Sequence, residues 1–148
     1  PEDHPDRKKI IAMMRNLAAA LARKQDPKTG LWYQVLNQET REGNFLEGSC
    51  SSMFAYFFLK GARKGYLDEV YRKKGKKAYE GLWAHLVKQR NEELLLTQVC
   101  AVAGLGYGRD GSYKYYINEK KRDNDPKAIG PFILAALEYE VLPTQEAK

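Results

Sequence analysis

Two adjacent aromatic residues, Trp32 and Tyr33, stand where they could line a binding site. They follow the turn predicted for Asp26–Gly30 and open a strand predicted for Leu31–Leu36. Aromatic rings can stack on the apolar faces of sugars, so the pair could line a sugar-binding site. Packing in the hydrophobic core explains the two residues equally well, and the sequence leaves both roles open.

A polar group flanks the start of a helix predicted for Phe45–Lys64. It consists of Asn44, Glu47 and Ser49. The free N–H groups at the start of a helix suit a bound carboxylate, so these residues could line an anion-binding pocket. Asn44 and Glu47 also have the spacing of a capping box, with Asn in place of the commoner Ser or Thr. Capping is the favoured interpretation.

A third candidate, Arg109, begins the turn-forming sequence Arg109–Gly111. Its guanidinium could bind a carboxylate through two parallel hydrogen bonds. Asp and Gly are also ordinary turn residues, so a structural turn is the favoured interpretation. Asp125 precedes Pro126, a pair typical of the N-cap and first turn of a helix.

No metal, redox or cofactor site is expected. Cys50 and Cys100 lie in apolar runs without CxxC spacing or a nearby His, which predicts free, buried thiols. His4 and His85 have no neighbours suited to metal ligation or catalysis.

These residues are positioned by a mainly helical chain. Apolar residues recur at helical spacing over Pro5–Lys24, Phe45–Lys64 and Leu67–Gln89, and a fourth helix follows Asp125. Two strand-like runs, Leu94–Ala103 and Ser112–Ile117, stand before that helix, joined by a Gly-rich turn region.

The helices alternate between one-sided and all-round apolar character, which indicates an amphipathic outer layer and a buried inner layer. Four helices cannot close such a ring. We therefore expect apolar patches that are covered by missing sequence, by a partner chain or by self-association.

The chain has 148 residues and a formal net charge of +6. Its length favours one domain, and its composition argues against disorder. No apolar run approaches the ~20 residues of a membrane-spanning helix, so no membrane span is expected. The lysine-rich run Arg72–Lys77, with the Tyr and Lys residues of Tyr107–Arg122, leaves nucleic-acid binding as an alternative. A solvated outer face is the favoured interpretation of that run.

Over most of its length the chain resembles the unsaturated rhamnogalacturonyl hydrolases of glycoside hydrolase family 105, with family 88 as the nearest relative. The order and spacing of several segments carry this resemblance. They are Pro1–Pro5, Gln25–Leu36, Gly43–Ser49, Ser52–Tyr56, Gly61–Leu67, Ala103–Gly106, Arg109–Tyr113 and Asn124–Lys127.

The resemblance implies an (α/α)6 barrel with short β-hairpins in its loops, of which residues 1–148 would form the C-terminal half of a single domain. It also implies hydrolysis of pectin-derived oligosaccharides that end in a 4,5-unsaturated uronic acid. In that reaction an acid protonates C4, water adds at C5, and the resulting hemiketal opens and releases the partner sugar. A non-catalytic helical interaction domain is a further alternative.

The family's proton donor is an Asp of the N-terminal half, so we expect no catalytic residue and no activity in this piece alone. The residues expected to contact substrate are Trp32, Tyr33, Asn44, Glu47, Ser49 and Arg109. A bacterial cytoplasmic location is favoured, with periplasmic or secreted locations as alternatives.

Overall fold

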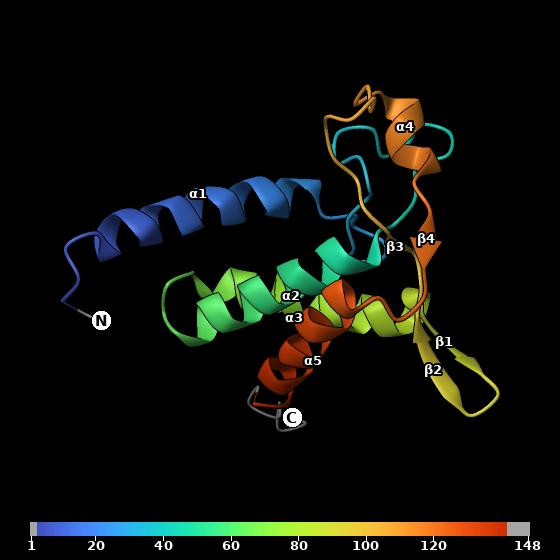
Figure 1. Cartoon of the computed structure of the whole chain (residues 1–148). Helices are drawn as coiled ribbons and strands as arrows, with labels where there is room; N and C mark the ends of the chain where they lie inside the picture. Colours follow the sequence, from blue (N-terminus) through green and yellow to red (C-terminus); the bar gives the residue numbers. More distant parts are fainter. Residues whose placement is uncertain (1–2, 142–148) are drawn as a thin grey trace.

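A computed structural model describes residues 3–141 as a mainly helical protein with few short strands (Figure 1). The helices are α1 (Arg7–Lys24), α2 (Gly48–Arg63), α3 (Glu69–Gly81), the π-helical turn η1 (Leu82–Leu86), α4 (Tyr113–Asn118) and α5 (Pro126–Glu140). The strands are β1 (Val87–Arg90), β2 (Glu93–Leu96), β3 (Val99–Cys100) and β4 (Lys121–Arg122).

Helix α2 is the centre of the fold and packs against both α3 and α5. Its sequence is apolar around most of its circumference, which suits a helix with neighbours on several sides. Helix α3 approaches it closely at Gly75, where a Cβ atom would lie 2.9 Å from Leu59 Cγ. The core is completed by side chains from every part of the chain. It includes Ala18, Leu21, Leu31, Trp32, Ala55, Phe58, Leu67, Ala78, Leu82, Leu86, Leu96, Val99, Ala128 and Ala135.

The four strands form two antiparallel pairs. Strand β1 pairs with β2, with Val87 opposite Leu96, and β3 pairs with β4, with Val99 opposite Arg122. The second pair lies beside the starts of α2 and α5. Strand β4 lies just before α5, and β3 follows the loop whose Gln98 carbonyl accepts a hydrogen bond from Gly48 N at the start of α2.

Two predicted strands are wrong. The run Leu31–Leu36 forms only an isolated bridge between Tyr33 and Leu46. The run Ser112–Ile117 forms helix α4, because the Ser112 hydroxyl caps the helix by accepting a hydrogen bond from Tyr115 N at 3.1 Å. Alternation of Tyr and Lys is therefore compatible with a short helix once a good N-cap precedes it.

Three predicted boundaries also differ from the structure. The strand expected over Leu94–Ala103 is split into β2 and β3, because Gln98 has a positive φ of 58° that interrupts extended backbone. The helix expected to start at Phe45 starts at Gly48. The helix expected to reach Gln89 ends in η1, and the chain then turns into β1.

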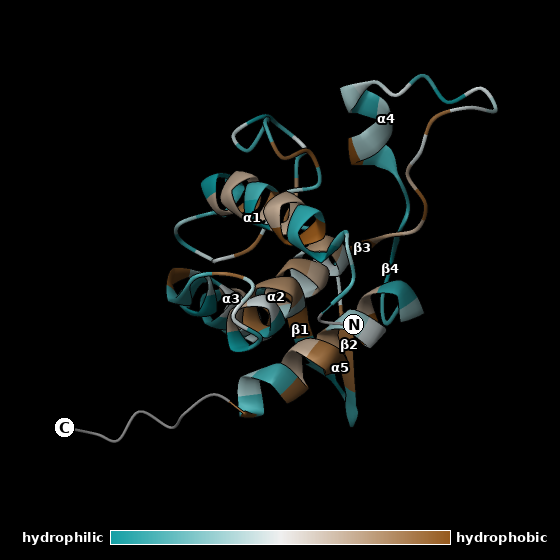
Figure 2. Ribbon diagram, turned by 90° about the vertical axis from the view of Figure 1, so that its left-hand side faces the viewer, coloured by the Kyte–Doolittle hydropathy of each residue, from teal (hydrophilic) through white to brown (hydrophobic). Residues whose placement is uncertain are grey.

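Helices α1 and α5 each expose apolar side chains. On α1, Ile10, Met13 and Leu17 form one exposed stripe at helical spacing. On α5 the exposed apolar residues are Ile133, Leu134 and Leu137, and Figure 2 shows apolar residues along much of this helix. The exposed apolar residues on α5 are the kind of patch that the sequence predicts for an apolar helix whose cover lies outside the four helices.

Within residues 3–141, none of the helices combines the length and the apolar character that crossing a membrane requires.

Candidate functional site

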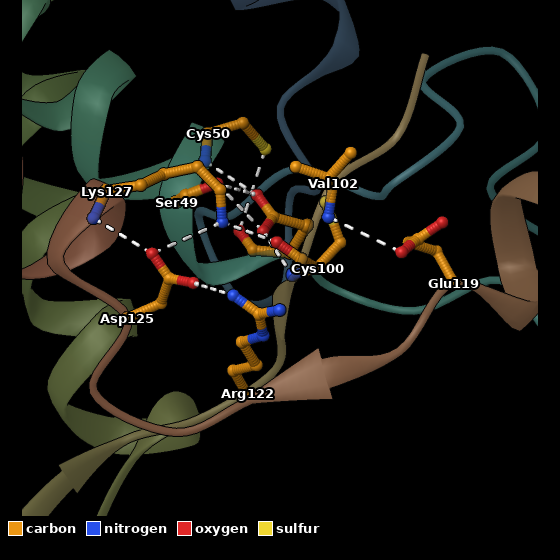
Figure 3. A network of polar contacts seen from close by, with 9 residues as sticks. Ser49, Cys50, Cys100, Val102, Glu119, Arg122, Asp125 and Lys127 are labelled. Carbon is orange, nitrogen blue, oxygen red and sulfur yellow. Dashed lines mark hydrogen bonds and ion pairs between the residues drawn. The ribbon is translucent and has the colours of Figure 1, made fainter. Parts of the chain in front are cut away.

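A pocket of about 600 Å³ lies where the N-termini of α2 and α5 meet the β3–β4 pair. Its lining residues come from separate segments of the chain, and Figure 3 shows a network of polar contacts that joins several of them. The lining residues are Gln34, Glu47, Ser49, Cys50, Cys100, Ala101, Val102, Ala103, Tyr116, Arg122, Asp125 and Lys127.

The buried carboxylate of Glu47 ties α2 to β3. One of its oxygens accepts a hydrogen bond from Cys50 N at 2.7 Å, which makes Glu47 the N-cap of α2. The other oxygen accepts from Cys100 N on β3 at 3.0 Å, and the Ser49 hydroxyl lies within hydrogen-bond distance of both. Within the described residues its partners are all donors, an arrangement that suits a carboxylate anion held in place.

Helix α2 can start at Gly48 only because this residue lacks a side chain. A Cβ atom there would lie 2.8 Å from the Thr97 carbonyl oxygen, closer than real Cβ atoms approach. The glycine therefore lets the start of α2 press against the loop before β3, which brings Glu47 within reach of Cys100.

Asp125 plays the corresponding role at α5. Its carboxylate accepts from Lys127 N at 3.0 Å and caps the helix, as predicted. The same carboxylate lies 3.7 Å from Arg122 Nη1 and 3.8 Å from Lys127 Nζ (Figure 3). The Lys127 ammonium also donates to the Cys100 carbonyl oxygen.

The four charged side chains at the pocket differ in exposure according to the sign of their charge. The side chain of Arg122 is 57% exposed and that of Lys127 is 33% exposed. The side chain of Asp125 is only 11% exposed, and Glu47 is 2% exposed. The pocket therefore presents its cations to an incoming molecule and keeps its carboxylates covered.

The two cysteines are free, as predicted, and both line the pocket. Burial raises the pKa of the Cys50 thiol well above its ordinary value, and the negative charge of Glu47 raises it further. Burial and Glu47 also raise the pKa of Cys100. Both groups are thus held as thiols, which disfavours a nucleophilic role.

The structure brings only two of the six predicted substrate-contacting residues to the pocket. Glu47 and Ser49 line it. Arg109 lies instead on a separate, smaller pocket beside α4, on the Gly-rich segment.

Three other predicted residues have structural positions. Trp32 is fully buried and donates from Nε1 to the Leu21 carbonyl oxygen, so it offers no face to a sugar. Tyr33 is half-buried next to its bridge partner Leu46 and does not line the pocket. Asn44 does not cap α2; its side-chain amide bonds to the backbone of Val35 and holds the preceding loop together.

Sequence reasoning missed the cationic wall. Lys127 follows the Asp125–Pro126 pair, whose local pattern indicates a helix start, and Arg122 ends the Tyr- and Lys-containing run Tyr107–Arg122, whose pattern leaves nucleic-acid binding as an alternative. Arg122 lines the same pocket as Glu47 because β4 pairs with β3. Among residues 3–141 there is no group of three or more His, Cys, Asp or Glu side chains that could hold a metal ion.

The sequence pattern of Glycosyl Hydrolase Family 88 matches residues 1–142. Two curated bacterial proteins are each 38% identical over 138 residues: Protein Atu3128 of Agrobacterium fabrum and the 24.9 kDa protein in picA locus of Rhizobium radiobacter. The match covers 86% of this chain, and the chain spans 58% of the length of each relative.

Two solved structures also superpose on this chain. A glycoside hydrolase from family 105 of C. acetobutylicum superposes with a TM-score of 0.91 at 45% identity, covering 96% of this chain and 40% of that one. A possible member of the GH105 family from Salmonella enterica has a TM-score of 0.76 at 28% identity, covering 94% of this chain and 33% of its own.

Proposed function

The chain belongs to glycosyl hydrolase family 88, and from this membership we propose that its protein hydrolyses pectin-derived oligosaccharides that end in a 4,5-unsaturated uronic acid. Membership of the family supports a glycosidase. The choice of an acidic sugar is supported by the pocket at the N-termini of α2 and α5, whose exposed charges are cationic.

The exposure of Arg122 and Lys127 over covered Glu47 and Asp125 is the observation that carries the proposal. A guanidinium with its N–H groups free for a ligand matches the two oxygens of a carboxylate. Within residues 3–141, the charged partner of Arg122 is Asp125 at 3.7 Å, too far for a hydrogen bond. We assign Arg122 to the carboxylate of the bound sugar.

Neutral polar groups complete the proposed sugar site. Gln34, Ser49 and Tyr116 line the pocket and offer an amide and two hydroxyl groups to sugar hydroxyls. Tyr116 reaches the pocket because residues 113–118 form helix α4. The proposed reaction follows the family's chemistry: protonation at C4 of the double bond, addition of water at C5, and opening of the hemiketal.

We assign the proton donor of this reaction to an aspartate outside these 148 residues. Glu47 is held as a hydrogen-bond acceptor and Asp125 caps α5, so both carboxylates that line the pocket have structural partners. The proposed role of residues 1–148 is therefore to supply part of the sugar-binding wall.

We also propose that α2 and α5 are inner helices, and α1 and α3 outer helices, of an (α/α)6 barrel whose remaining part covers the exposed stripes. The superposition with the C. acetobutylicum structure, which extends well beyond the matched region, supports this arrangement. Two exposed apolar stripes lie on different helices: Ile10, Met13 and Leu17 on α1, and Ile133, Leu134 and Leu137 on α5. The part of the barrel that covers them would therefore contact both α1 and α5.

Self-association is the alternative cover for these stripes, and it would make the chain a non-catalytic interaction domain. Analytical ultracentrifugation separates the two possibilities. The proposal expects the 148-residue chain to associate on its own and a protein with the whole family domain to lose that association. Equal association of both would favour the interaction domain.

The enzymatic proposal is tested by following the loss of the double-bond ultraviolet absorbance of an unsaturated galacturonyl-rhamnose disaccharide. We expect activity in a protein that carries the whole family domain and none in residues 1–148 alone. Activity of the 148 residues alone would refute the assignment of the proton donor. Inactivity of both on this substrate would refute the proposed function.

The assignment of Arg122 is tested in the same assay with Arg122→Gln and, as the matched control, Lys88→Gln, an exposed cation on β1 outside the pocket. Loss of one charge-assisted contact, worth about 1.5 kcal/mol, should raise KM roughly tenfold. The control should leave KM unchanged. An unaltered KM in Arg122→Gln would show that this guanidinium does not bind the substrate.

A further inference from the structure

A second groove, of about 590 Å³, lies between the C-terminal end of α1 and α3. It shares no residue with the pocket described above. Its lining residues are Ala22, Arg23, Gln25, Asp26, Pro27, Val70, Lys73, Lys74 and Lys77. We call it the α1–α3 groove.

The α1–α3 groove concentrates cations that lack acidic partners. No carboxylate among residues 3–141 lies within ion-pair distance of Arg23, Lys73, Lys74 or Lys77. The neighbouring cations of α3 behave differently. Arg72 pairs with Glu69 at 3.0 Å and Lys76 faces Glu80 at 3.8 Å.

Asp26 is the one acidic residue among the described residues that line the groove, and its carboxylate is hydrogen-bonded to Thr29. One carboxylate oxygen of Asp26 accepts hydrogen bonds from both the backbone N–H and the hydroxyl of Thr29, at 2.7 and 2.6 Å. Asp26 thus stabilises its own turn. It leaves most of the positive charge of the groove uncompensated.

The walls of the groove are held together by hydrogen bonds between the two segments. The side-chain amide of Gln25 donates to the carbonyl oxygens of Gly30 and Lys74, at 2.8 and 3.0 Å. The Lys77 ammonium donates to the carbonyl oxygen of Pro27. These hydrogen bonds hold the backbone near Arg23 close to the backbone of α3.

We propose that the α1–α3 groove binds a linear polyuronate, an acidic polysaccharide chain, at a site separate from the pocket at the N-termini of α2 and α5. Lys73 and Lys77 are one helical turn apart, about 6 Å along α3, so they present charge along a line. The exposed side chain of Val70 offers an apolar contact for the C–H face of a sugar ring.

The composition of the groove favours a polysaccharide over a nucleic acid. None of the described residues that line it is aromatic. Proteins that bind single-stranded nucleic acids combine a basic groove with aromatic rings on which bases stack. The choice of a polyuronate among acidic polysaccharides rests on the proposed function.

The test measures binding of polygalacturonate oligomers to the protein by isothermal titration calorimetry in low salt. The informative variant is Arg23→Gln/Lys73→Gln, which removes two exposed cations of the groove with no side-chain hydrogen bonds in the described residues. The matched control is Lys88→Gln/Lys114→Gln, which removes the same charge from exposed positions elsewhere. Arg122→Gln serves as a third variant that alters only the pocket.

We expect polygalacturonate to bind, and the groove variant to weaken binding about fivefold to tenfold, as two exposed charge contacts would predict. The control should weaken it less than twofold. Binding should persist in Arg122→Gln even if the disaccharide assay shows the proposed function to be wrong. Added salt should weaken the binding, because exposed charge contacts are screened.

Three results would overturn the proposal. One is an equal loss in the groove and control variants, which would mean attraction to net charge alone. Another is a loss in Arg122→Gln but not in the groove variant, which would place the polymer in the pocket. The third is tighter binding of single-stranded DNA than of polygalacturonate, lost in the groove variant, which would make the groove a nucleic-acid site.

Discussion

Replacement of Glu47 by Gln tests the most consequential polar contact of the structure. In the wild-type protein, one oxygen of Glu47 accepts from Cys50 N and the other from Cys100 N. A Gln side chain keeps one oxygen and replaces the other with an NH₂ group. One of the two backbone N–H groups would then face a donor instead of an acceptor.

The expected loss follows from this geometry. A buried polar group without a partner costs about 1–3 kcal/mol, and a hydrogen bond to a charged group contributes about 1.5–3 kcal/mol. Glu47→Gln loses one such bond and weakens the remaining ones. We therefore expect the free energy of unfolding to fall by about 3 kcal/mol, a large share of the ~5–15 kcal/mol of a typical domain.

Urea unfolding measures this change, with Glu42→Gln as the matched control. Glu42 is an exposed carboxylate on the preceding loop, and its substitution should change the unfolding free energy by less than about 0.5 kcal/mol. Amide hydrogen exchange locates the effect, because the N–H groups of Cys50 and Cys100 should lose protection first. A Glu47→Gln protein as stable as Glu42→Gln, with unchanged exchange at Cys100, would refute the reasoning.

Two further substitutions test how the helices are packed and paired. Gly81→Ala should destabilise the protein by about 3 kcal/mol in urea unfolding, because its Cβ would lie 2.0 Å from the Thr29 carbonyl oxygen. The control is Gly104→Ala, whose Cβ would meet only the end of the flexible Arg109 side chain at 3.7 Å, and it should change the stability by less than about 1 kcal/mol. Equal stabilities would contradict the close approach at Gly81. The hydrogen bonds from Arg63 lower the pKa of Glu138 from its ordinary value of 4.5. The Arg63–Glu138 pair therefore stabilises the folded state above pH 4.5, and this stabilisation is lost as the pH falls through the lowered pKa. Glu138→Gln should therefore lower stability at pH 7 and flatten its decline below pH 4.5 in acid-unfolding curves, whereas an unchanged pH profile would rule out this contribution.

Local signals in the sequence predicted the helices better than the site. Four long helices and the Asp125 cap are confirmed, because helical periodicity and N-cap chemistry act over a few neighbouring residues. The same kind of reasoning put the cap of α2 at Asn44. Three residues further on, Glu47 caps the helix instead, because Gly48 permits the contact with the loop before β3.

The pocket depends on contacts that no local pattern contains. Arg122 and Glu47 are far apart in the sequence, and they line one pocket because β4 pairs with β3 and α5 packs on α2. Trp32 shows the opposite error. An aromatic residue next to a turn has the sequence features of a binding residue, and only its packing against Phe54 and Phe58 identifies it as core.

The two tryptophans of the chain provide a pair of built-in fluorescent reporters. Trp32 is fully enclosed among the aromatic rings of α2, whereas Trp83 is 43% exposed and touches Phe132 of α5. Emission from an enclosed indole reports on the integrity of the α2 core, and emission from Trp83 reports on the solvent at the α5 side of the molecule. With Trp32 replaced by Phe, a blue shift of the remaining emission would register the arrival of any segment that covers this side, without an added label.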